Sequence, residues 1–314
     1  MNKVTEIINN IEKIMVGKRK VVEKIVIALL TNGHVLIEDV PGVGKTQCVS
    51  ALARSVDGSF KRIQFTPDVM ASDITGFTMY NPTTGVFEYK EGSANCNFLL
   101  ADEINRATPK TQSALLEAMG EKSVTVGKVT YDMPKPFMVL ATQNPIEQEG
   151  TYPLPEAQLD RFQFKVKVDF PSLDELSKII DLTLGKEGEE INSVLNGKEI
   201  LEMKEAIREI PIADPVKEYA LKIILATHPE VKEGHELSKK YVEVGASPRA
   251  AQGLISGAKV KAVMEGRYNV SFDDIKYIAY PVLRHRIILN FEGITEGITE
   301  EYIIEKILED LRVV

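Results

Sequence analysis

A glycine-containing run at residues 40–46 has the composition of a loop that binds phosphate groups. The run reads Val40-Pro41-Gly42-Val43-Gly44-Lys45-Thr46. An apolar run precedes it and a segment with helical periodicity follows, so the sequence predicts a strand, a tight loop and a helix. This geometry turns several backbone N–H groups and a helix N-terminus toward one anion. With Lys45 on the β- and γ-phosphates and the Thr46 hydroxyl on Mg²⁺, we expect a nucleoside triphosphate as the ligand.

An ordinary strand-to-helix turn is the alternative interpretation, because glycines in such turns often serve only the backbone. Lys45 argues against it, since a bare turn gives no reason for a cation at the start of a helix, against the helix dipole. The chain has Asp39 where the strict phosphate-loop pattern has glycine. We therefore expect the Asp39 side chain to point away from the phosphates.

Two adjacent carboxylates, Asp102 and Glu103, follow the largely apolar run at residues 97–101, which predicts a buried strand. In open α/β sheets, ligands bind at the edge formed by the carboxyl ends of the strands. Asp102 could hold Mg²⁺ there, often through water, and Glu103 could polarise the attacking water. A solvated strand end is the alternative, but Lys45 and Thr46 upstream favour the functional interpretation.

Three further polar residues have both an ordinary and a functional interpretation. Asn144 follows a buried apolar run at residues 137–142. It either begins a turn with the proline after it or orients a water molecule against the γ-phosphate. Arg161 could be a surface cation paired with Asp160, and Arg249 could be a surface residue at the start of a helix. For each arginine taken alone, the ordinary interpretation is favoured.

The elements that must position these residues follow from the hydrophobic periodicity. Strands separated by helical stretches indicate a mostly parallel sheet between helices up to residue 170. Turn signals and alternating runs predict a hairpin-bearing insertion at residues 66–95 and a second hairpin at residues 123–131. After residue 171 the pattern is almost wholly helical. The helices are expected at residues 173–184, 198–208, 213–228, 247–264, 272–287 and 299–311.

Composition limits the class of protein. The 314 residues are 44% hydrophobic and 27% charged, as in soluble globular proteins. No apolar run reaches the roughly 18 residues of a transmembrane helix, and the N-terminus lacks the apolar core of a secretory signal. Cys48 and Cys96 have no metal-binding spacing, which predicts a reducing cytoplasm. The net charge of −8 disfavours a dedicated nucleic-acid-binding protein.

Taken together, these residues resemble the AAA+ ATPases. The order is a phosphate loop, a strand-borne Asp-Glu, a strand-borne Asn, an Arg in a Leu-Asp-Arg-Phe turn, and a Ser-Pro-Arg in a helical region. Several short sequence motifs within residues 16–260 resemble those of the MoxR group of AAA+ ATPases. These motifs lie at residues 64–68 and 72–76, 101–107, 154–162 and 245–249. The resemblance implies an α/β P-loop core at residues 1–170, followed by a smaller all-α lid domain at residues 171–314.

The resemblance also implies a role for each candidate residue. Asn144 is implied as sensor 1 at the γ-phosphate, Arg161 as the arginine finger entering a neighbouring subunit's site, and Arg249 as sensor 2 on the lid. Residues 66–95 and 123–131 are implied as the helix-2 and pre-sensor-1 insertions. The implied nucleotide contacts are Val16 and Gly17 near the adenine, and Pro41, Gly42, Val43, Gly44, Lys45, Thr46 and Gln47 at the phosphates.

The activity implied by the resemblance is Mg²⁺-dependent ATP hydrolysis. Because site and finger would lie on different surfaces, the interface is heterologous and should close into a ring of identical chains, by resemblance a hexamer. The ring would remodel or mature partner proteins in a chaperone-like role. We expect a partner with a von Willebrand factor A-like domain, and we expect neither membrane insertion nor nucleic acid as a partner.

Other functions stay open. A nucleic-acid translocase is one, because Lys122, Lys128 and Lys135 lie in and around the second predicted hairpin. A non-catalytic, nucleotide-gated scaffold is another, although an inactive site has no physical need for Lys45, Glu103, Asn144 and Arg161 together. A magnesium-chelatase-like motor subunit is a near relative that only these short motifs exclude.

Overall fold

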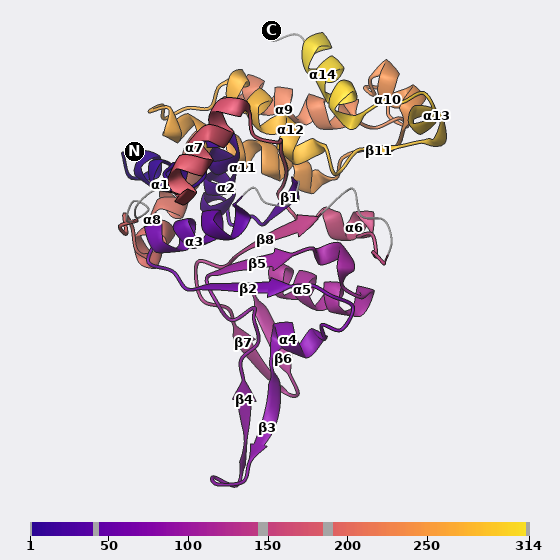
Figure 1. Ribbon diagram of the computed structural model, residues 1–314. Coiled ribbons are helices and arrows are strands. Elements are labelled where there is room, and N and C mark those ends of the chain that lie inside the picture. The colour runs from indigo at the N-terminus through magenta and orange to yellow at the C-terminus, as the bar shows by residue number, and fades with distance from the viewer. Residues whose placement is uncertain (1, 40–43, 144–149, 185–190, 312–314) are drawn as a thin grey trace. The chain divides into compact units, whose positions relative to one another are not determined.

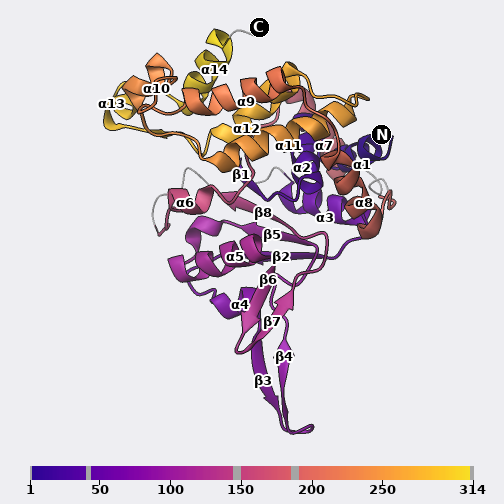
Figure 2. The same ribbon diagram turned by 180° about the vertical axis from the view of Figure 1, so that it is seen from behind.

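The structure, a computed structural model, describes residues 2–39, 44–143, 150–184 and 191–311 (Figures 1 and 2). The chain divides into two compact units, each formed by two separate segments. The sheet unit comprises Asn2–Arg161 and Val166–Leu201. The helical unit comprises Phe162–Lys165 and Glu202–Val314. The expected domain boundary at residue 170 stays a prediction.

A five-stranded sheet organises the first part of the chain, in the order β2-β5-β8-β1-β9. The strands are β1 (Val35–Asp39), β2 (Phe60–Gln64), β5 (Phe98–Asp102), β8 (Met138–Gln143) and β9 (Phe164–Val168). The pairings of β1 with β8, β8 with β5 and β5 with β2 are parallel. Parallel strands end at the same edge, so the carboxyl ends of β1, β5 and β8 meet there. This edge positions the predicted site.

The sheet unit also contains helices. They are α1 (Asn2–Glu12), α2 (Arg19–Leu30), α3 (Lys45–Ser55), α4 (Ala71–Thr75), η1 (Ile104–Arg106), α5 (Pro109–Glu121), α6 (Glu156–Leu159), α7 (Leu173–Leu184) and the beginning of α8 (Gly197–Arg208). Helix α3 packs on β2 and β5, and α1 packs on both α2 and α3. Helix α1 is amphipathic: its apolar residues Val4, Ile7, Ile8 and Ile11 recur at helical spacing and are all buried.

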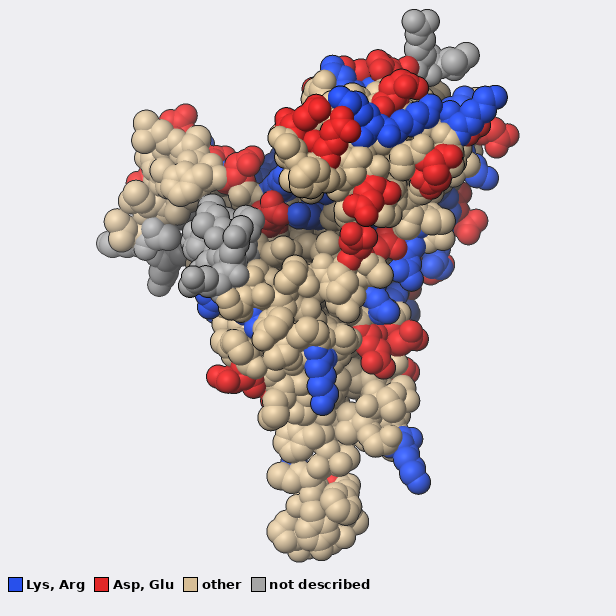
Figure 3. Space-filling view, turned by 90° about the vertical axis from the view of Figure 1, so that its right-hand side faces the viewer, with Lys and Arg blue, Asp and Glu red and all other residues tan. Residues whose placement is uncertain are grey.

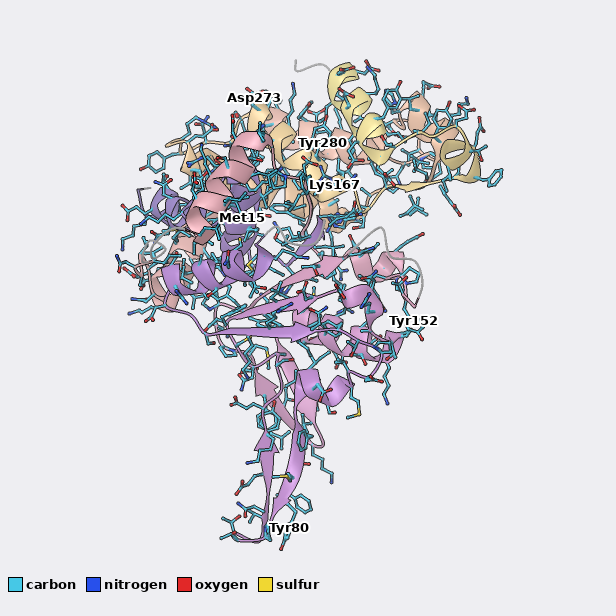
Figure 4. All side chains as sticks on the ribbon, viewed as in Figure 1. Met15, Tyr80, Tyr152, Lys167, Asp273 and Tyr280 are labelled. Atoms are coloured by element: carbon cyan, nitrogen blue, oxygen red, sulfur yellow. The ribbon has the colours of Figure 1, made fainter. Side chains whose placement is uncertain are left out.

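Both predicted hairpins are present, and they project from the sheet unit side by side (Figures 1 and 2). One pairs β3 (Phe77–Asn81) with β4 (Val86–Lys90), and the other pairs β6 (Ser123–Val126) with β7 (Val129–Asp132). The rings of Tyr89 and Tyr131 stack between the hairpins with centroids 3.9 Å apart. Tyr80 lies near the far end of the first hairpin (Figure 4). On the face of this projection that Figure 3 shows, charged atoms are few.

The helical unit has its own core. Its elements are the rest of α8, α9 (Asp214–Ala226), α10 (Glu236–Tyr241), β10 (Val242–Val244), α11 (Pro248–Met264), α12 (Phe272–Leu283), β11 (Ile288–Leu289), α13 (Phe291–Thr295) and α14 (Glu300–Asp310). Helix α11 packs against α9 and α12. A Cβ at Gly257 of α11 would lie 2.9 Å from the Ile278 side chain, so glycine permits this close approach. The ribbon of β10 and β11 and the short helices α10 and α13 were not predicted, and α12 ends four residues earlier than the expected residue 287.

The segment Phe162–Lys165 is tied to the end of α12 by two buried side chains. His285 Nε2 donates to the Phe162 carbonyl at 2.9 Å. Arg286 donates to the same carbonyl at 2.7 Å and to the Gln163 carbonyl at 3.1 Å. Burial, reinforced by the charge of Arg286, lowers the pKa of His285 well below its ordinary value, so His285 is neutral.

Among the described residues, no helix is both long and apolar enough to cross a membrane.

Candidate active site

Lys45 is the first residue of α3, where the sequence predicts it. Gly44, its N-cap, has φ +82° and ψ 22°, a left-handed conformation that favours glycine. The first turn of α3 contains no acidic residue, so the positive end of the helix is left available to an anion. Thr46 is partly buried and Gln47 is exposed in the same turn. Pro41, Gly42 and Val43 lie outside the described residues.

Asp102, the last residue of β5, is the acceptor at the centre of the site and is 6% exposed. Its Oδ1 atom accepts from the Thr142 hydroxyl at 2.6 Å and lies 3.6 Å from Lys45 Nζ. Its Oδ2 atom accepts from Arg62 at 2.7 Å. Burial raises the pKa of Asp102, but the hydrogen bonds from Thr142 and Arg62 and the charge of Lys45 outweigh it. The pKa therefore lies below its ordinary value, and the carboxylate is ionised at neutral pH.

Glu103 adopts an uncommon backbone conformation, with φ 56° and ψ 50°. Such a conformation is unfavourable for a residue with a Cβ, and residues of this kind cluster at active sites. The Glu103 N–H donates to the Thr142 hydroxyl at 2.9 Å. The Glu103 carboxylate lies 3.2 Å from Arg106 Nε. The two predicted acidic residues therefore have different partners, Thr142 and Arg62 for the Asp102 carboxylate and Arg106 for the Glu103 carboxylate.

The oxygen atoms at this edge fit a magnesium ion that arrives with phosphates. Asp102 and Thr46 offer carboxylate and hydroxyl oxygens, which Mg²⁺ prefers. Both Asp102 oxygens already face protein donors, which favours contact with the ion through water. In the described ranges, no group of three or more His, Cys, Asp or Glu residues is placed to hold a metal. The remaining ligands would therefore be water and phosphate oxygens.

The predicted adenine contacts lie in the turn between α1 and α2. Gly17 has φ +75°, and a Cβ there would meet Glu175 Oε1 of α7 at 2.1 Å. The same Glu175 carboxylate pairs with Lys18 at 3.0 Å. Glycine at position 17 therefore allows α7 to approach this turn. The adenine role of Val16 and Gly17 stays a prediction, as does the role of Asn144, which lies outside the described residues.

Arg161 rests on α5 of its own chain. It is exposed, and its Nη1 atom donates to the Leu116 carbonyl at 2.6 Å. A Cβ at Gly120 would lie 2.6 Å from that nitrogen, so glycine makes room for the guanidinium. The hydrogen bond described for Arg161 is thus to α5 rather than to the Asp102 carboxylate. Arg249 occupies the first turn of α11 in the helical unit, after Pro248 at the predicted helix start.

Replacing Gly120 by Ala tests whether residues 120 and 161 are coupled in the free energy of unfolding. Alanine favours a helix over glycine by up to about 1 kcal/mol. Here the new methyl group would displace Arg161 from the Leu116 carbonyl, which offsets about 0.5–1 kcal/mol of that gain. Chemical unfolding should therefore show a larger gain from Gly120→Ala when Arg161 is already alanine. Equal gains in the two backgrounds would exclude the coupling.

Two residues of the site were missed in the sequence. Arg62 lies on β2 and Thr142 on β8, on the two strands that flank β5. Each bonds to Asp102, a residue 40 positions away in the chain. The available signals were a hydroxyl in an otherwise apolar run and a cation inside a short strand, and neither names a partner.

The parallel sheet with a lysine opposite a buried strand-end carboxylate is typical of P-loop nucleotide-binding proteins, and the comparisons place the chain among the AAA-type ATPases. A family model described as the ATPase family associated with various cellular activities (AAA) matches residues 34–164. A model of the AAA lid domain matches residues 235–307. The crystal structure of a Cytophaga hutchinsonii protein superposes with a TM-score of 0.93 and is 42% identical, covering 100% of this chain and 95% of that one.

Similar sequences narrow the class further. The chain is 45% identical to the uncharacterized protein YeaC of Bacillus subtilis, over 98% of this chain and 93% of that protein. It is 42% identical to Chaperone MoxR1 of Mycobacterium tuberculosis, over 95% of this chain and 79% of that protein. It is 30% identical to Protein MoxR of Methylorubrum extorquens, over 89% of this chain and 85% of that protein. The chain therefore belongs to the MoxR family of AAA+ ATPases.

Membership in this family confirms three predictions. The chain is an ATP-hydrolysing enzyme, its family is the one that the motifs resemble, and its fold class is the α/β P-loop core with a lid domain. The lid is mainly helical, with the small β10–β11 ribbon added. Nucleotide binding follows from the family, whereas the roles of individual site residues stay predictions.

Proposed function

We propose that this ATPase works as a closed ring of its own copies and couples hydrolysis of Mg²⁺-bound ATP to remodelling or maturation of partner proteins. The observation that carries the proposal is the pairing of Lys45 with the buried carboxylate of Asp102, with Glu103 next in the chain and Arg161 on a different contact. A phosphoryl-transfer site needs a cation against the developing charge of the γ-phosphate. In this proposal Arg161 of another copy supplies a cation to the γ-phosphate in addition to Lys45.

Each residue then has one task. Lys45 and the N-terminus of α3 bind the phosphates, and Thr46 and Asp102 hold Mg²⁺. When bound, Mg²⁺ would offset the negative charge of the phosphate oxygens. Glu103 polarises the attacking water, while Asn144 orients it. Arg161 from the neighbour stabilises the transition state, a contribution of about 10³–10⁵ in rate in other phosphoryl-transfer systems.

The lid would convert this chemistry into movement. Arg249 on α11 would bind the nucleotide from the lid domain, and hydrolysis would weaken that contact. The two hairpins would then move with the nucleotide state, as parts that face the pore or rim of the ring. The name of Chaperone MoxR1, 42% identical to this chain, supports a chaperone-like role. A hexameric ring, a cytoplasmic location and a partner with a von Willebrand factor A-like domain complete the proposal.

Steady-state ATPase activity against protein concentration tests the ring. With Mg²⁺ present, the specific activity should rise steeply with concentration, because sites shared between copies exist only in the assembly. Adding single-stranded or duplex DNA should leave the activity unchanged. A specific activity that stays constant down to concentrations at which the chain sediments as a monomer would exclude shared sites. Strong stimulation by DNA would favour a translocase instead.

Mixing two inactive variants tests the finger directly. Arg161→Ala lacks the finger but keeps Glu103, while Glu103→Gln keeps the finger, so each supplies what the other lacks. In an equal mixture roughly a quarter of the head-to-tail interfaces should be complete, and ATPase activity should return in that proportion. As a control, the Arg161→Ala, Glu103→Gln double variant should rescue neither single variant. Absence of rescue in rings shown by cross-linking to be mixed would refute a shared site.

A further inference from the structure

The hydroxyl group of Thr142 joins the two acidic residues of the site. Thr142 is 1% exposed. Its Oγ1 atom donates to Asp102 Oδ1 at 2.6 Å and accepts the backbone N–H of Glu103 at 2.9 Å. This one buried hydroxyl therefore donates a hydrogen bond to the Asp102 carboxylate and accepts one from the backbone N–H of Glu103. Both of these residues carry a proposed task in hydrolysis.

The contact exists because the strand ladder ends at this point. The parallel register of β5 and β8 runs to the pair Ala101 and Ala141. Beyond that pair, Glu103 turns into the left-handed conformation with φ 56°. The Thr142 hydroxyl takes the Glu103 N–H that a continued ladder would have paired. A buried N–H without an acceptor is costly, so this hydroxyl stabilises the unusual backbone conformation of Glu103.

The second oxygen of Asp102 is held in a different way. Arg62, which donates to Oδ2, has a side chain that is 46% exposed. An exposed arginine can move aside when a cation approaches. Thr142 is a buried residue of β8 and lacks that freedom. Of the two donors to Asp102, the Thr142 hydroxyl is therefore the one whose position is fixed. It binds Oδ1, the oxygen next to Lys45.

We propose that Thr142 is a positioning residue for ATP hydrolysis. Its hydroxyl fixes the orientation of the Asp102 carboxylate toward the side where Mg²⁺ would bind. It also holds the Glu103 backbone in the conformation from which the Glu103 carboxylate can reach the attacking water. The inference rests on the proposed function of Asp102 and Glu103, and it adds the residue that sets their relative geometry.

Two substitutions separate this role from ordinary packing. Thr142→Val keeps the shape of the side chain and removes the hydroxyl, whereas Thr142→Ser keeps the hydroxyl and removes a methyl group. If Thr142 acts only by packing, the Val variant should retain more ATPase activity than the Ser variant. If the hydroxyl positions Asp102 and Glu103, the Ser variant should retain more activity than the Val variant. Thr142→Ala, compared with Thr142→Ser, gives the same contrast at matched volume if the Val variant fails to fold.

The variants should be compared with the unchanged chain and with Glu103→Gln. For Thr142→Val we expect kcat to fall about 10- to 100-fold and the half-saturating Mg²⁺ concentration to rise about tenfold, as for outer-shell partners of metal ligands. Binding of a fluorescent ATP analogue in EDTA should stay within about twofold, since Lys45 and α3 are unchanged. Thr142→Ser should restore kcat and the Mg²⁺ dependence. Thermal melting reports whether each variant is folded.

The outcomes distinguish this inference from the function on which it rests. Normal kcat and Mg²⁺ dependence in Thr142→Val, with an inactive Glu103→Gln, would overturn the inference alone. Equal losses in the Val and Ser variants, with lowered melting temperatures, would also overturn it in favour of packing. Normal turnover by Glu103→Gln would instead remove the proposed catalytic role of Glu103.

Discussion

A Glu103→Gln variant should bind ATP as tightly as the unchanged chain and hydrolyse it about 10²- to 10⁴-fold more slowly. The amide has nearly the shape of the carboxylate but cannot polarise or deprotonate the attacking water. Both side chains of the lost ion pair with Arg106 are partly exposed, so its loss should cost little stability. Equilibrium binding of a fluorescent ATP analogue and single-turnover hydrolysis measure the two effects separately.

The matched control is Glu218→Gln, which also removes one negative charge and one surface ion pair, with Lys222 on α9. This control should retain full turnover. A Glu103→Gln variant with the turnover of the unchanged chain would show that another group activates the water. A variant that loses ATP binding as well would place Glu103 in the binding of the nucleotide.

Replacing Lys45 by Ala should weaken ATP binding by about 10- to 150-fold, because hydrogen bonds to charged groups contribute about 1.5–3 kcal/mol. The lysine also faces Asp102, and its charge is one of the causes that hold the pKa of that carboxyl down. The variant should therefore raise the pKa of Asp102, and its carboxylate should become protonated at a higher pH. Titration calorimetry with ATP measures the affinity directly.

Lys20→Ala, an exposed lysine on α2, controls for the loss of one positive charge. It should leave the affinity for ATP unchanged. If Lys45→Ala also binds ATP with unchanged affinity, Lys45 is not a phosphate ligand and the loop at residues 40–46 has another role. If both variants lose affinity equally, a general effect of net charge explains the result.

Local signals made much of the fold predictable. A glycine before a lysine marks the start of α3, and largely apolar runs mark β5 and β8 as buried strands. The ribbon of β10 and β11 was missed because strands of three and two residues are too short to show an alternating pattern. Helices α10 and α13, with six and five residues, are short for the same kind of signal.

Predicting the site had a different limit. Lys45, Asp102 and Glu103 each carry a motif, so their chemistry could be inferred from residue type and spacing. Arg62 and Thr142 contact Asp102 only because β2 and β8 are the neighbours of β5 in the sheet. Strand order is a property of the folded chain, and periodicity along the sequence does not contain it. The close approach of Arg161 to Gly120 could not be predicted from the sequence for the same reason.

The lid domain cannot be exchanged as one continuous block of sequence. The segment Phe162–Lys165 belongs to the helical unit, yet residues 166–201 return the chain to the sheet unit before the lid helices begin. A chimaera that takes its lid from a relative at residue 171 would combine a native strand segment with a foreign α12. The buried side chains of His285 and Arg286 would then have to pack against a segment from a different parent, 123 residues upstream, to reach its carbonyls. Recombination between relatives should succeed when both segments come from the same parent.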